Sequence, residues 1–139
     1  MFLFWTTIGL VISIGVLYQR SYGAVSKTFY ALTLVVAALI YLLFALNGLF
    51  WTEAVFYWVL IQIAGTILFS LIAFMAYKKV YNPFILLSMG WFSHTLWDLV
   101  MHVFETSSFI PSFYPPICIG FDLGFGVYLL YHVFRGLKE

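Results

Sequence analysis

The chain has 139 residues, of which 65% are hydrophobic and 22% aromatic, and only 8% are charged, compared with about 25% in an ordinary soluble domain. Roughly a third of the chain's surface stays exposed in a soluble fold of this length, so this composition indicates an integral membrane protein. The formal charge of +1, with no cluster of basic residues, excludes a nucleic-acid partner, and the single Cys118 excludes an intrachain disulfide framework.

Apolar runs of membrane-spanning length predict an all-α fold. There are five of them, at residues 2–18, 28–50, 54–77, 83–104 and 117–134. Ser26 can cap the second helix, and Asn82 followed by Pro83 is a typical start for the fourth. Gly136 follows the fifth run, where a left-handed closing residue is expected. We therefore predict one domain over residues 1–139, a bundle of five transmembrane helices.

The charges of the connections predict an orientation. Glutamates lie in the second and fourth connections, as Glu53 and Glu105. The basic residues all lie in the first and third connections and in the tail: Arg20, Lys27, Lys78, Lys79, Arg135 and Lys138. Basic residues favour the cytoplasmic side, so we expect the amino terminus outside and the carboxyl terminus in the cytoplasm. The first run lacks a basic leader and cleavage site, so it is expected to be a spanning helix.

The fourth predicted helix contains an unusual polar segment, HTLWDLVMH, at residues 94–102. His94, Asp98 and His102 are spaced i, i+4 and i+8, a drift of only about 80° around a helix, so they form one stripe. Glu105 extends the stripe to the outer rim. With a rise of about 1.5 Å per residue, His94 is expected close to mid-membrane and Asp98 roughly 6 Å farther out.

The fifth predicted helix enters from the same side with Cys118 and Asp122 on one face. Counted from residue 117, Asp122 reaches a depth of roughly 8 Å, which matches the expected depth of Asp98. Gly120 and Gly124 allow close approach to a neighbouring helix. We therefore expect the two aspartates to meet at one level, whereas Cys118 is more typical of a small packing residue than of a ligand.

Weaker polar groups on other helices suggest a cavity. Asn47 near the outer end of the second run and Gln62 on the third are at compatible heights, and Trp97 is expected to form a wall. The segment 105–116, with three prolines and three aromatic residues, is predicted to be a stiff loop lying at the interface and covering the entrance. The natural hypothesis is an outward-opening polar cavity walled by helices two to five.

The polar stripe supports two kinds of chemistry. His94, Asp98, His102 and Asp122 are suitable ligands for a divalent metal such as zinc or iron. His94 and His102 are about 12 Å apart along the helix, so a single ion would use only one of them. Without a metal, one of two desolvated carboxylates is expected to hold a proton and act as a general acid beside a histidine base. The interpretation without chemistry is a packing network that fixes the helix register.

Residues 90–122 resemble a known pattern. The segments GWFSHTLWDLVMH and IPSFYPPICIGFD are similar to the signature of a small uncharacterised family of bacterial integral membrane proteins, a domain of unknown function. By position, the resemblance implies importance for His94, Trp97, Asp98, His102, Cys118 and Asp122. Met101 stands where that family often has a histidine, so one expected ligand of a dinuclear site is missing. The resemblance implies a multi-pass protein of the bacterial inner membrane.

Three functions fit these observations. The first is a membrane-embedded enzyme acting on a lipid or isoprenoid, with Asp98, Asp122, His94 and His102 as catalytic groups, because intramembrane ionisable residues usually mark a site. The second is a small proton-coupled transporter that uses the stripe as a relay. The third is a structural or assembly subunit, whose partners would be other membrane proteins or further copies of the chain.

Overall fold

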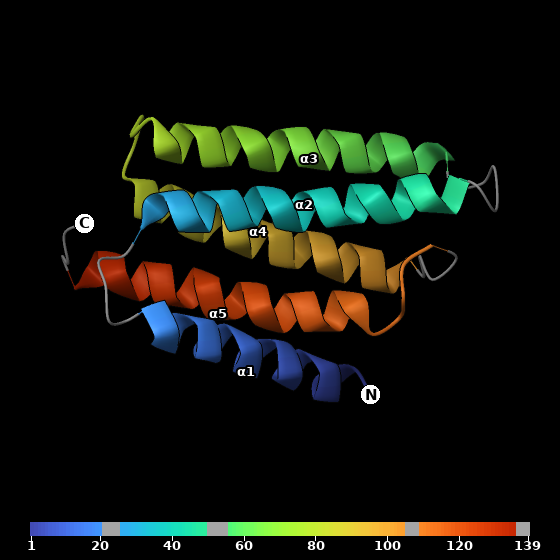
Figure 1. The fold of residues 1–139 in the computed structure, drawn as a ribbon, viewed down its shortest axis with the longest axis horizontal. Helices are drawn as coiled ribbons and strands as arrows, with labels where there is room; N and C mark the ends of the chain where they lie inside the picture. Colours follow the sequence, from blue (N-terminus) through green and yellow to red (C-terminus); the bar gives the residue numbers. More distant parts are fainter. Residues whose placement is uncertain (21–25, 50–55, 105–108, 136–139) are drawn as a thin grey trace.

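The structure is a computed structural model and describes residues 1–20, 26–49, 56–104 and 109–135 (Figure 1). Within these ranges the chain forms helices and no strand. The helices are α1 (Phe2–Arg20), α2 (Lys27–Leu49), α3 (Phe56–Tyr77), α4 (Pro83–Val103) and α5 (Tyr114–Phe134).

All five helices are long and apolar enough to cross a membrane. They correspond one to one with the five predicted runs, so the all-helical fold and its five candidate spans are confirmed. The amino-terminal end of α1 and the carboxyl-terminal end of α5 lie at opposite ends of the bundle (Figure 1). Which end faces the cytoplasm stays a prediction from the charges.

Local capping chemistry explains two of the helix starts. The Asn82 side-chain oxygen accepts hydrogen bonds from the backbone N–H groups of Phe84 and Ile85 at 3.0 and 3.3 Å, and Pro83 occupies the first helical position. The Ser26 hydroxyl accepts a hydrogen bond from the Phe29 N–H at 3.3 Å. Both caps satisfy backbone donors that the first helical turn leaves unpaired, as predicted. Glu53 in the second connection and the expected closing residue Gly136 lie outside the described residues.

The start of α5 differs from the prediction. The helix begins at Tyr114, three residues before the predicted start, and Pro115 and Pro116 lie in its first turn. Proline is tolerated there because first-turn N–H groups have no partner within the helix. The second half of the predicted interfacial loop also differs, because Phe109 and Ile110 are buried in the core beside Tyr41. The free energy gained by burying these two apolar side chains explains why this part of the segment lies in the core and not at the interface.

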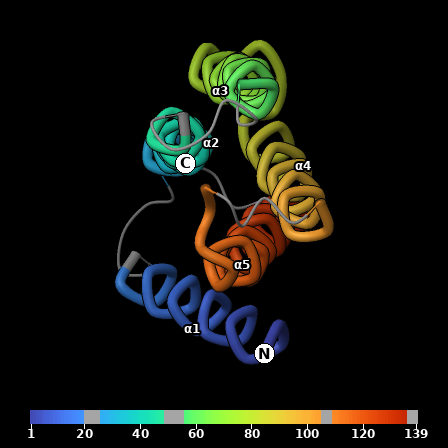
Figure 2. Tube along the Cα trace, turned by 90° about the vertical axis from the view of Figure 1, so that its right-hand side faces the viewer, coloured from blue at the N-terminus to red at the C-terminus, as the bar shows by residue number. Residues whose placement is uncertain are grey.

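Helix α4 lies in the middle of the bundle. It contacts α5 on one side and α3 and α2 on the other, whereas α1 packs along α5 at the edge (Figure 2). The difference is visible in burial: 44% of the apolar window of α4 is buried, against 11% of that of α1. Polar side chains on α4 are therefore the ones that the fold removes most completely from its surroundings.

Small residues join α1 to α5. A side chain at Gly9 would overlap the backbone oxygen of Ile117, one at Gly120 would overlap that of Thr6, and one at Gly124 would overlap the Ser13 hydroxyl. Glycine at these positions lets the two backbones touch, as is common between transmembrane helices. The sequence predicted close approach at Gly120 and Gly124, and the structure shows that the neighbour is α1.

Candidate functional site

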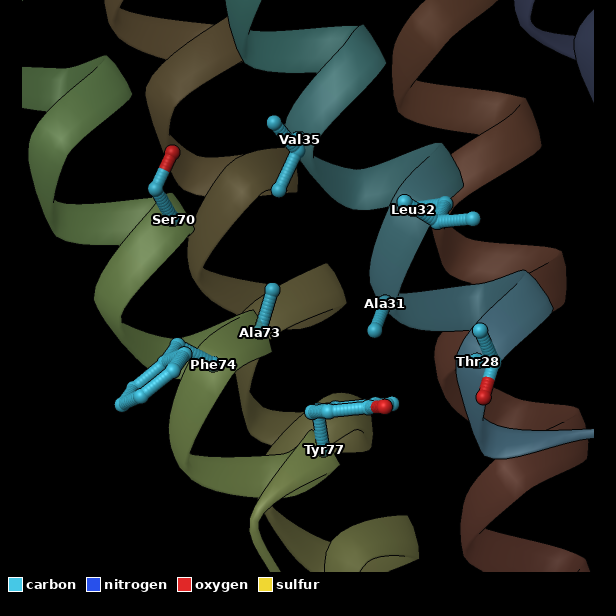
Figure 3. Close-up of a pocket in the computed structure, with 8 residues that line it drawn as sticks. All are labelled: Thr28, Ala31, Leu32, Val35, Ser70, Ala73, Phe74 and Tyr77. Carbon is cyan, nitrogen blue, oxygen red and sulfur yellow. The ribbon is translucent and has the colours of Figure 1, made fainter.

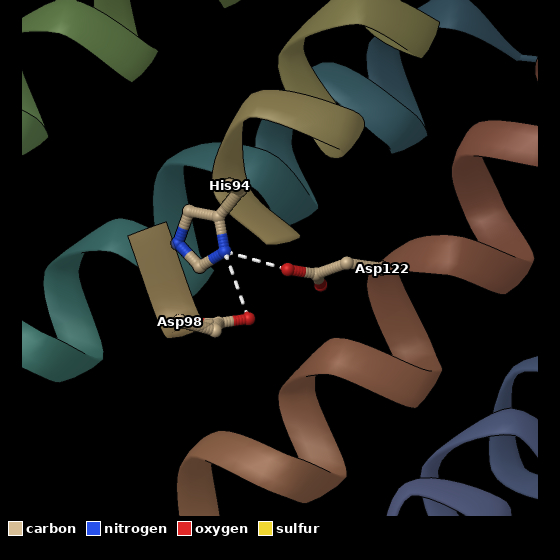
Figure 4. Close-up of side chains that lie close together, drawn as sticks. All are labelled: His94, Asp98 and Asp122. Carbon is tan, nitrogen blue, oxygen red and sulfur yellow. Dashed lines mark hydrogen bonds and ion pairs between the residues drawn. The ribbon is translucent and has the colours of Figure 1, made fainter. Parts of the chain in front are cut away.

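His94, Asp98 and Asp122 form a cluster at the interface of α4 and α5 (Figure 4). His94 and Asp98 are fully buried and Asp122 is 1% exposed. The His94 Nδ1 atom lies 2.7 Å from Asp122 Oδ2 and 3.6 Å from Asp98 Oδ2. Three of the most polar side chains in the protein therefore share one point inside the helix bundle.

The short contact fixes the chemical role of the two imidazole nitrogens. An ionised carboxylate only accepts hydrogen bonds, so the 2.7 Å contact is satisfied when Nδ1–H donates to Asp122 Oδ2. The Nε2 atom points away from both carboxylates (Figure 4), and it has no hydrogen-bond partner among the described residues. Asp122 thus orients the ring and leaves Nε2 unpaired, an arrangement in which carboxylates are known to orient histidines for proton transfer.

Asp98 is held differently. It lies one helical turn from His94 on the same face of α4, and neither of its carboxyl oxygens has a hydrogen-bond partner in the described part of the chain. Its closest charged neighbour is His94, whose Nδ1 atom lies 3.6 Å from Asp98 Oδ2 and whose hydrogen bond goes to Asp122 instead, so a buried charge on Asp98 is only partly compensated. The carboxyl group of Asp98 is therefore available to a proton, an ion or a bound molecule.

Aromatic rings surround the imidazole of His94. The ring centroids of Phe69, Tyr41 and Trp91 lie 4.8, 6.0 and 6.4 Å from that of the imidazole. The Tyr41 hydroxyl and the Trp91 Nε1–H are buried and, within the described residues, unpaired. Sequence analysis did not identify these three. Trp91 could have been found, because it lies three residues before His94 on one helix; Tyr41 and Phe69 look like ordinary apolar positions.

Charge balance restricts the states that this cluster can adopt. An uncompensated charge is costly inside an apolar bundle, and more so in a membrane. The cluster is neutral when all three side chains are uncharged, when a protonated His94 faces one ionised aspartate, or when a neutral His94 and both carboxylates balance a divalent cation. The 2.7 Å contact between His94 and Asp122 fits the loading in which His94 is protonated, Asp122 ionised and Asp98 protonated.

The two aspartates lie close together, as expected from the sequence. The ligand atoms of His94, Asp98 and Asp122 are all within 4.8 Å of one another. Because α5 begins at Tyr114, Asp122 is eight residues into the helix, about 12 Å along its axis instead of the roughly 8 Å predicted. Its shortest contact is with the imidazole of His94, at 2.7 Å.

Gln62 and Trp97 form a separate polar contact. The Trp97 Nε1–H donates to Gln62 Oε1 at 3.1 Å, and Gln62 Nε2 donates to Met101 Sδ at 3.0 Å. The Trp97 ring lies against Gly65, where a Cβ atom would approach it to 2.7 Å. These residues connect α3 to α4, and Phe69 links them to the cluster, because its ring centroid lies 6.1 Å from that of Trp97 and 4.8 Å from that of His94.

Of the remaining predicted residues, Cys118 lies near enough to Asp98 and Asp122 to interact with them electrostatically, whereas His102 and Asn47 have other surroundings. His102 is half-buried, with its ring centroid 4.9 Å from that of Phe2 on α1. The drift of about 80° from His94 is enough to turn it toward another helix. Asn47 is exposed, and Cys118 is a half-buried free thiol. Glu105 lies outside the described residues, as does the first part of the predicted entrance loop.

A second contact between α4 and α5 fixes their spacing. The buried Ser88 hydroxyl donates to the backbone oxygen of Gly126 at 2.8 Å. A side chain at Gly126 would approach the Phe92 ring to 3.0 Å. This contact lies on the Lys78 side of the cluster, so the two helices are held together on that side independently of the ionisable groups.

The cluster also has a geometry compatible with a metal ion. Its three residues each offer a ligand atom within 4.8 Å of the others. Tetrahedral zinc with bonds of about 2.0–2.2 Å separates its ligand atoms by roughly 3.3 Å. The distances of 2.7 and 3.6 Å from Nδ1 to the two carboxylates bracket that value. His102 is too far along the helix to join, so the donor set is one histidine and two aspartates.

Comparison with known proteins finds no match for this chain among protein-family models, curated proteins or solved structures. The resemblance to the bacterial family of unknown function stays a prediction, and the argument for function rests on the site.

Proposed function

We propose that this protein is a membrane-embedded enzyme that protonates or isomerises a double bond of an isoprenoid lipid, with His94 as the acid and base. One observation supports this proposal above all others. The imidazole is oriented by a 2.7 Å contact with Asp122, while its Nε2 atom is buried and, in the described part of the chain, without a partner. A ring held on one side and unpaired on the other is arranged for proton transfer to a bound molecule.

The proposed chemistry starts from the state in which His94 is protonated, Asp122 is ionised and Asp98 is protonated. Protonated His94 gives the Nε2 proton to one carbon of the double bond, the N–H bond breaks, and a C–H bond forms. The resulting carbocation loses a proton from a neighbouring carbon back to Nε2, which shifts the double bond and restores the imidazolium. Asp122 keeps its ionised contact with Nδ1 throughout. Asp98, in its protonated form, keeps the cluster neutral and provides a proton close to the imidazole.

The aromatic surroundings suit such a reaction. Aromatic faces attract cations within about 6 Å of the ring centroid, and the attraction strengthens where water is excluded. Tyr41, Phe69 and Trp91 provide three rings around His94. An isoprenoid brings only apolar surface and a double bond to this site, which suits a surrounding of aromatic rings.

Deuterium incorporation tests the proposal. The purified protein is reconstituted in nanodiscs and incubated in deuterium oxide with polyprenols and polyprenyl phosphates, whose carbon-bound deuterium is measured by mass spectrometry. We expect incorporation that grows with time and a loss of at least about 100-fold in His94→Gln, the usual size of a general acid–base contribution. The matched control is His132→Gln, because His132 is also a buried histidine but contacts Phe84 and Tyr128.

Two outcomes would contradict the enzyme. Incorporation at the level of empty nanodiscs for every polyprenyl substrate rejects this chemistry. Equal incorporation in His94→Gln and wild type rejects His94 as the acid, provided that both proteins elute as folded species from size exclusion.

A metal-assisted form of the same enzyme is the second candidate. It is favoured by the three ligand atoms within 4.8 Å and by the unpaired carboxyl group of Asp98. Two carboxylates and a neutral imidazole would balance a divalent zinc or iron ion. Three protein ligands leave a fourth position open, which is typical of catalytic rather than structural zinc. The ion would supply a Lewis acid and an activated water.

Metal content separates the two forms. Protein purified through a tag without histidines is analysed by inductively coupled plasma mass spectrometry. The metal form predicts about one equivalent of zinc or iron, lost in Asp98→Asn and in Asp122→Asn and kept in His132→Gln. Metal-free wild-type protein that incorporates deuterium supports the proton form and rejects the metal form.

Transport and assembly roles have weaker support from the geometry. A proton relay needs polar groups that continue from Asp98 toward the outer face, and in the described residues the next positions are Met101 and the buried Phe109 and Ile110. A purely structural network is expected to be satisfied, whereas Nε2 of His94 and both oxygens of Asp98 are not. We propose the bacterial inner membrane as the location, with the bilayer as the source of substrate.

A further inference from the structure

A groove between α2 and α3 lies away from the cluster of His94, Asp98 and Asp122. Its volume is about 300 Å³, at the lower end of the range of small-molecule sites. Ala31 and Ala73 form its middle, where small side chains leave the space that larger ones would fill (Figure 3). The full lining is Thr28, Ala31, Leu32, Val35, Ser70, Ala73, Phe74 and Tyr77.

The groove is apolar along its length and polar at one end. Thr28 lies in the first turn of α2 and Tyr77 is the last residue of α3, so both hydroxyls belong to the same end of the bundle. Figure 3 shows Tyr77 extending toward the α2 side at the level of Thr28. Leu32 and Phe74 are 61% and 57% exposed. An apolar groove that opens sideways from two candidate membrane spans faces lipid chains.

Positive charge gathers at the polar end. The Lys78 ammonium lies 5.7 Å from the ring centroid of Phe74 and 5.9 Å from that of Tyr77, two residues of the groove. Lys27 is the first residue of α2, whose amino-terminal end adds a partial positive charge. The sequence has no Asp or Glu before residue 53 or between residues 54 and 97.

The backbone holds Lys78 in place. Lys79 has a positive φ of 56°, and the N–H groups of Lys79 and Val80 donate to the backbone oxygens of Ala76 and Met75 at 3.2 and 3.1 Å. These two bonds form the Schellman closure of a helix, which usually has glycine at the left-handed position. Lys78 is the residue just before it, so the closure of α3 determines where the ammonium lies.

We propose that this groove binds one anionic glycerophospholipid, with an acyl chain along Ala31 and Ala73 and the phosphate between Lys78, Lys27 and the hydroxyls of Thr28 and Tyr77. The charge of the rim selects an anionic headgroup, since basic residues at a membrane surface attract anionic lipids. The apolar lining selects a lipid rather than a free phosphate. This site is independent of the proposed enzyme activity.

Native mass spectrometry tests the lipid site. Protein in a neutral detergent is titrated with phosphatidylglycerol and with phosphatidylcholine of identical acyl chains. We expect the first phosphatidylglycerol to bind more tightly than the first phosphatidylcholine. Lys78→Gln should weaken it about fivefold, and Lys27→Gln with Lys78→Gln about 25-fold, down to the phosphatidylcholine level, from the usual contribution of one lysine. These surface substitutions do not disturb the core.

A second pair of variants tests the groove itself. Val35→Trp fills it, and Leu39→Trp places the same ring on the exposed surface of α2 one turn away. Loss of the tight lipid in Val35→Trp alone supports the groove. Equal affinity for the two lipids, or an unchanged preference in the lysine variants, overturns the proposal. Equal loss in both tryptophan variants, or a dimer that Val35→Trp dissociates while the lipid stays bound, overturns it as well.

Discussion

Two faces of α5 make contacts of opposite kinds. Toward α1, a side chain at Gly120 would meet the backbone oxygen of Thr6 and one at Gly124 the Ser13 hydroxyl, so these glycines let the two helices approach closely. Toward α4, Asp122 bonds to His94 and the Gly126 oxygen accepts from Ser88. The first face holds the edge helix α1 through close packing of small residues. The second brings ionisable groups together, although an interface of small residues would hold the helices without their cost. The comparison shows that packing two of these helices does not by itself require ionisable groups.

The largest loss of stability is expected from His94→Leu. The change leaves Asp122 buried without its partner, and breaking one half of a buried charged pair typically costs about 3–5 kcal/mol. The measurement is reversible unfolding in mixed micelles, followed by circular dichroism. His94→Leu with Asp122→Leu should recover most of that loss. An additive double variant would show that the two residues do not form a pair.

Gly120→Leu is expected to cost about 3 kcal/mol, the upper part of the usual range for overpacking. Its side chain would overlap the backbone oxygen of Thr6, which cannot move away without shifting α1. The matched control is Gly15→Leu on α1, because a Cβ atom at Gly15 meets nothing within 4 Å. Equal stability of the two variants would show that α1 does not pack on α5 as described.

Ser88→Ala tests the polar contact that lies outside the cluster. It removes the hydrogen bond to the Gly126 oxygen, and such bonds between transmembrane helices average about 0.6 kcal/mol. A loss of about that size in the same unfolding assay, with deuterium incorporation unchanged, would separate bracing from chemistry. A large loss of activity would place Ser88 in the functional site.

A similarly small change in stability, less than about 1 kcal/mol, is expected from Asp98→Asn, because neither carboxyl oxygen loses a hydrogen bond within the described structure. Asparagine is close in shape to the protonated acid. Activity should fall much more than stability. The prediction is checked by measuring both the free energy of unfolding and deuterium incorporation in Asp98→Asn and in the wild type. Full activity of the variant would show that Asp98 has no part in the mechanism.

The sequence predicted the helices well because the signals are local. Membrane-spanning length and hydropathy are properties of each run alone, and the caps at Ser26 and Asn82 depend on residues within one turn. The start of α5 was harder, since prolines are compatible with either a loop or a first helical turn. Burial of Phe109 and Ile110 depends on Tyr41, which is far away in the sequence.

The composition of the cluster was predictable, and its pairing was not. His94 and Asp98 share a face because they are four residues apart, which any helix guarantees. Helical spacing cannot give the rotation of one helix against another or the identity of its neighbour. The rotation and the neighbour of each helix follow from side-chain packing. Packing places Asp122 against His94, turns His102 toward Phe2 and brings Gly120 into contact with α1. The sequence by itself determined five helices and a polar stripe, and only the tertiary structure decided which groups of that stripe come together with Asp122.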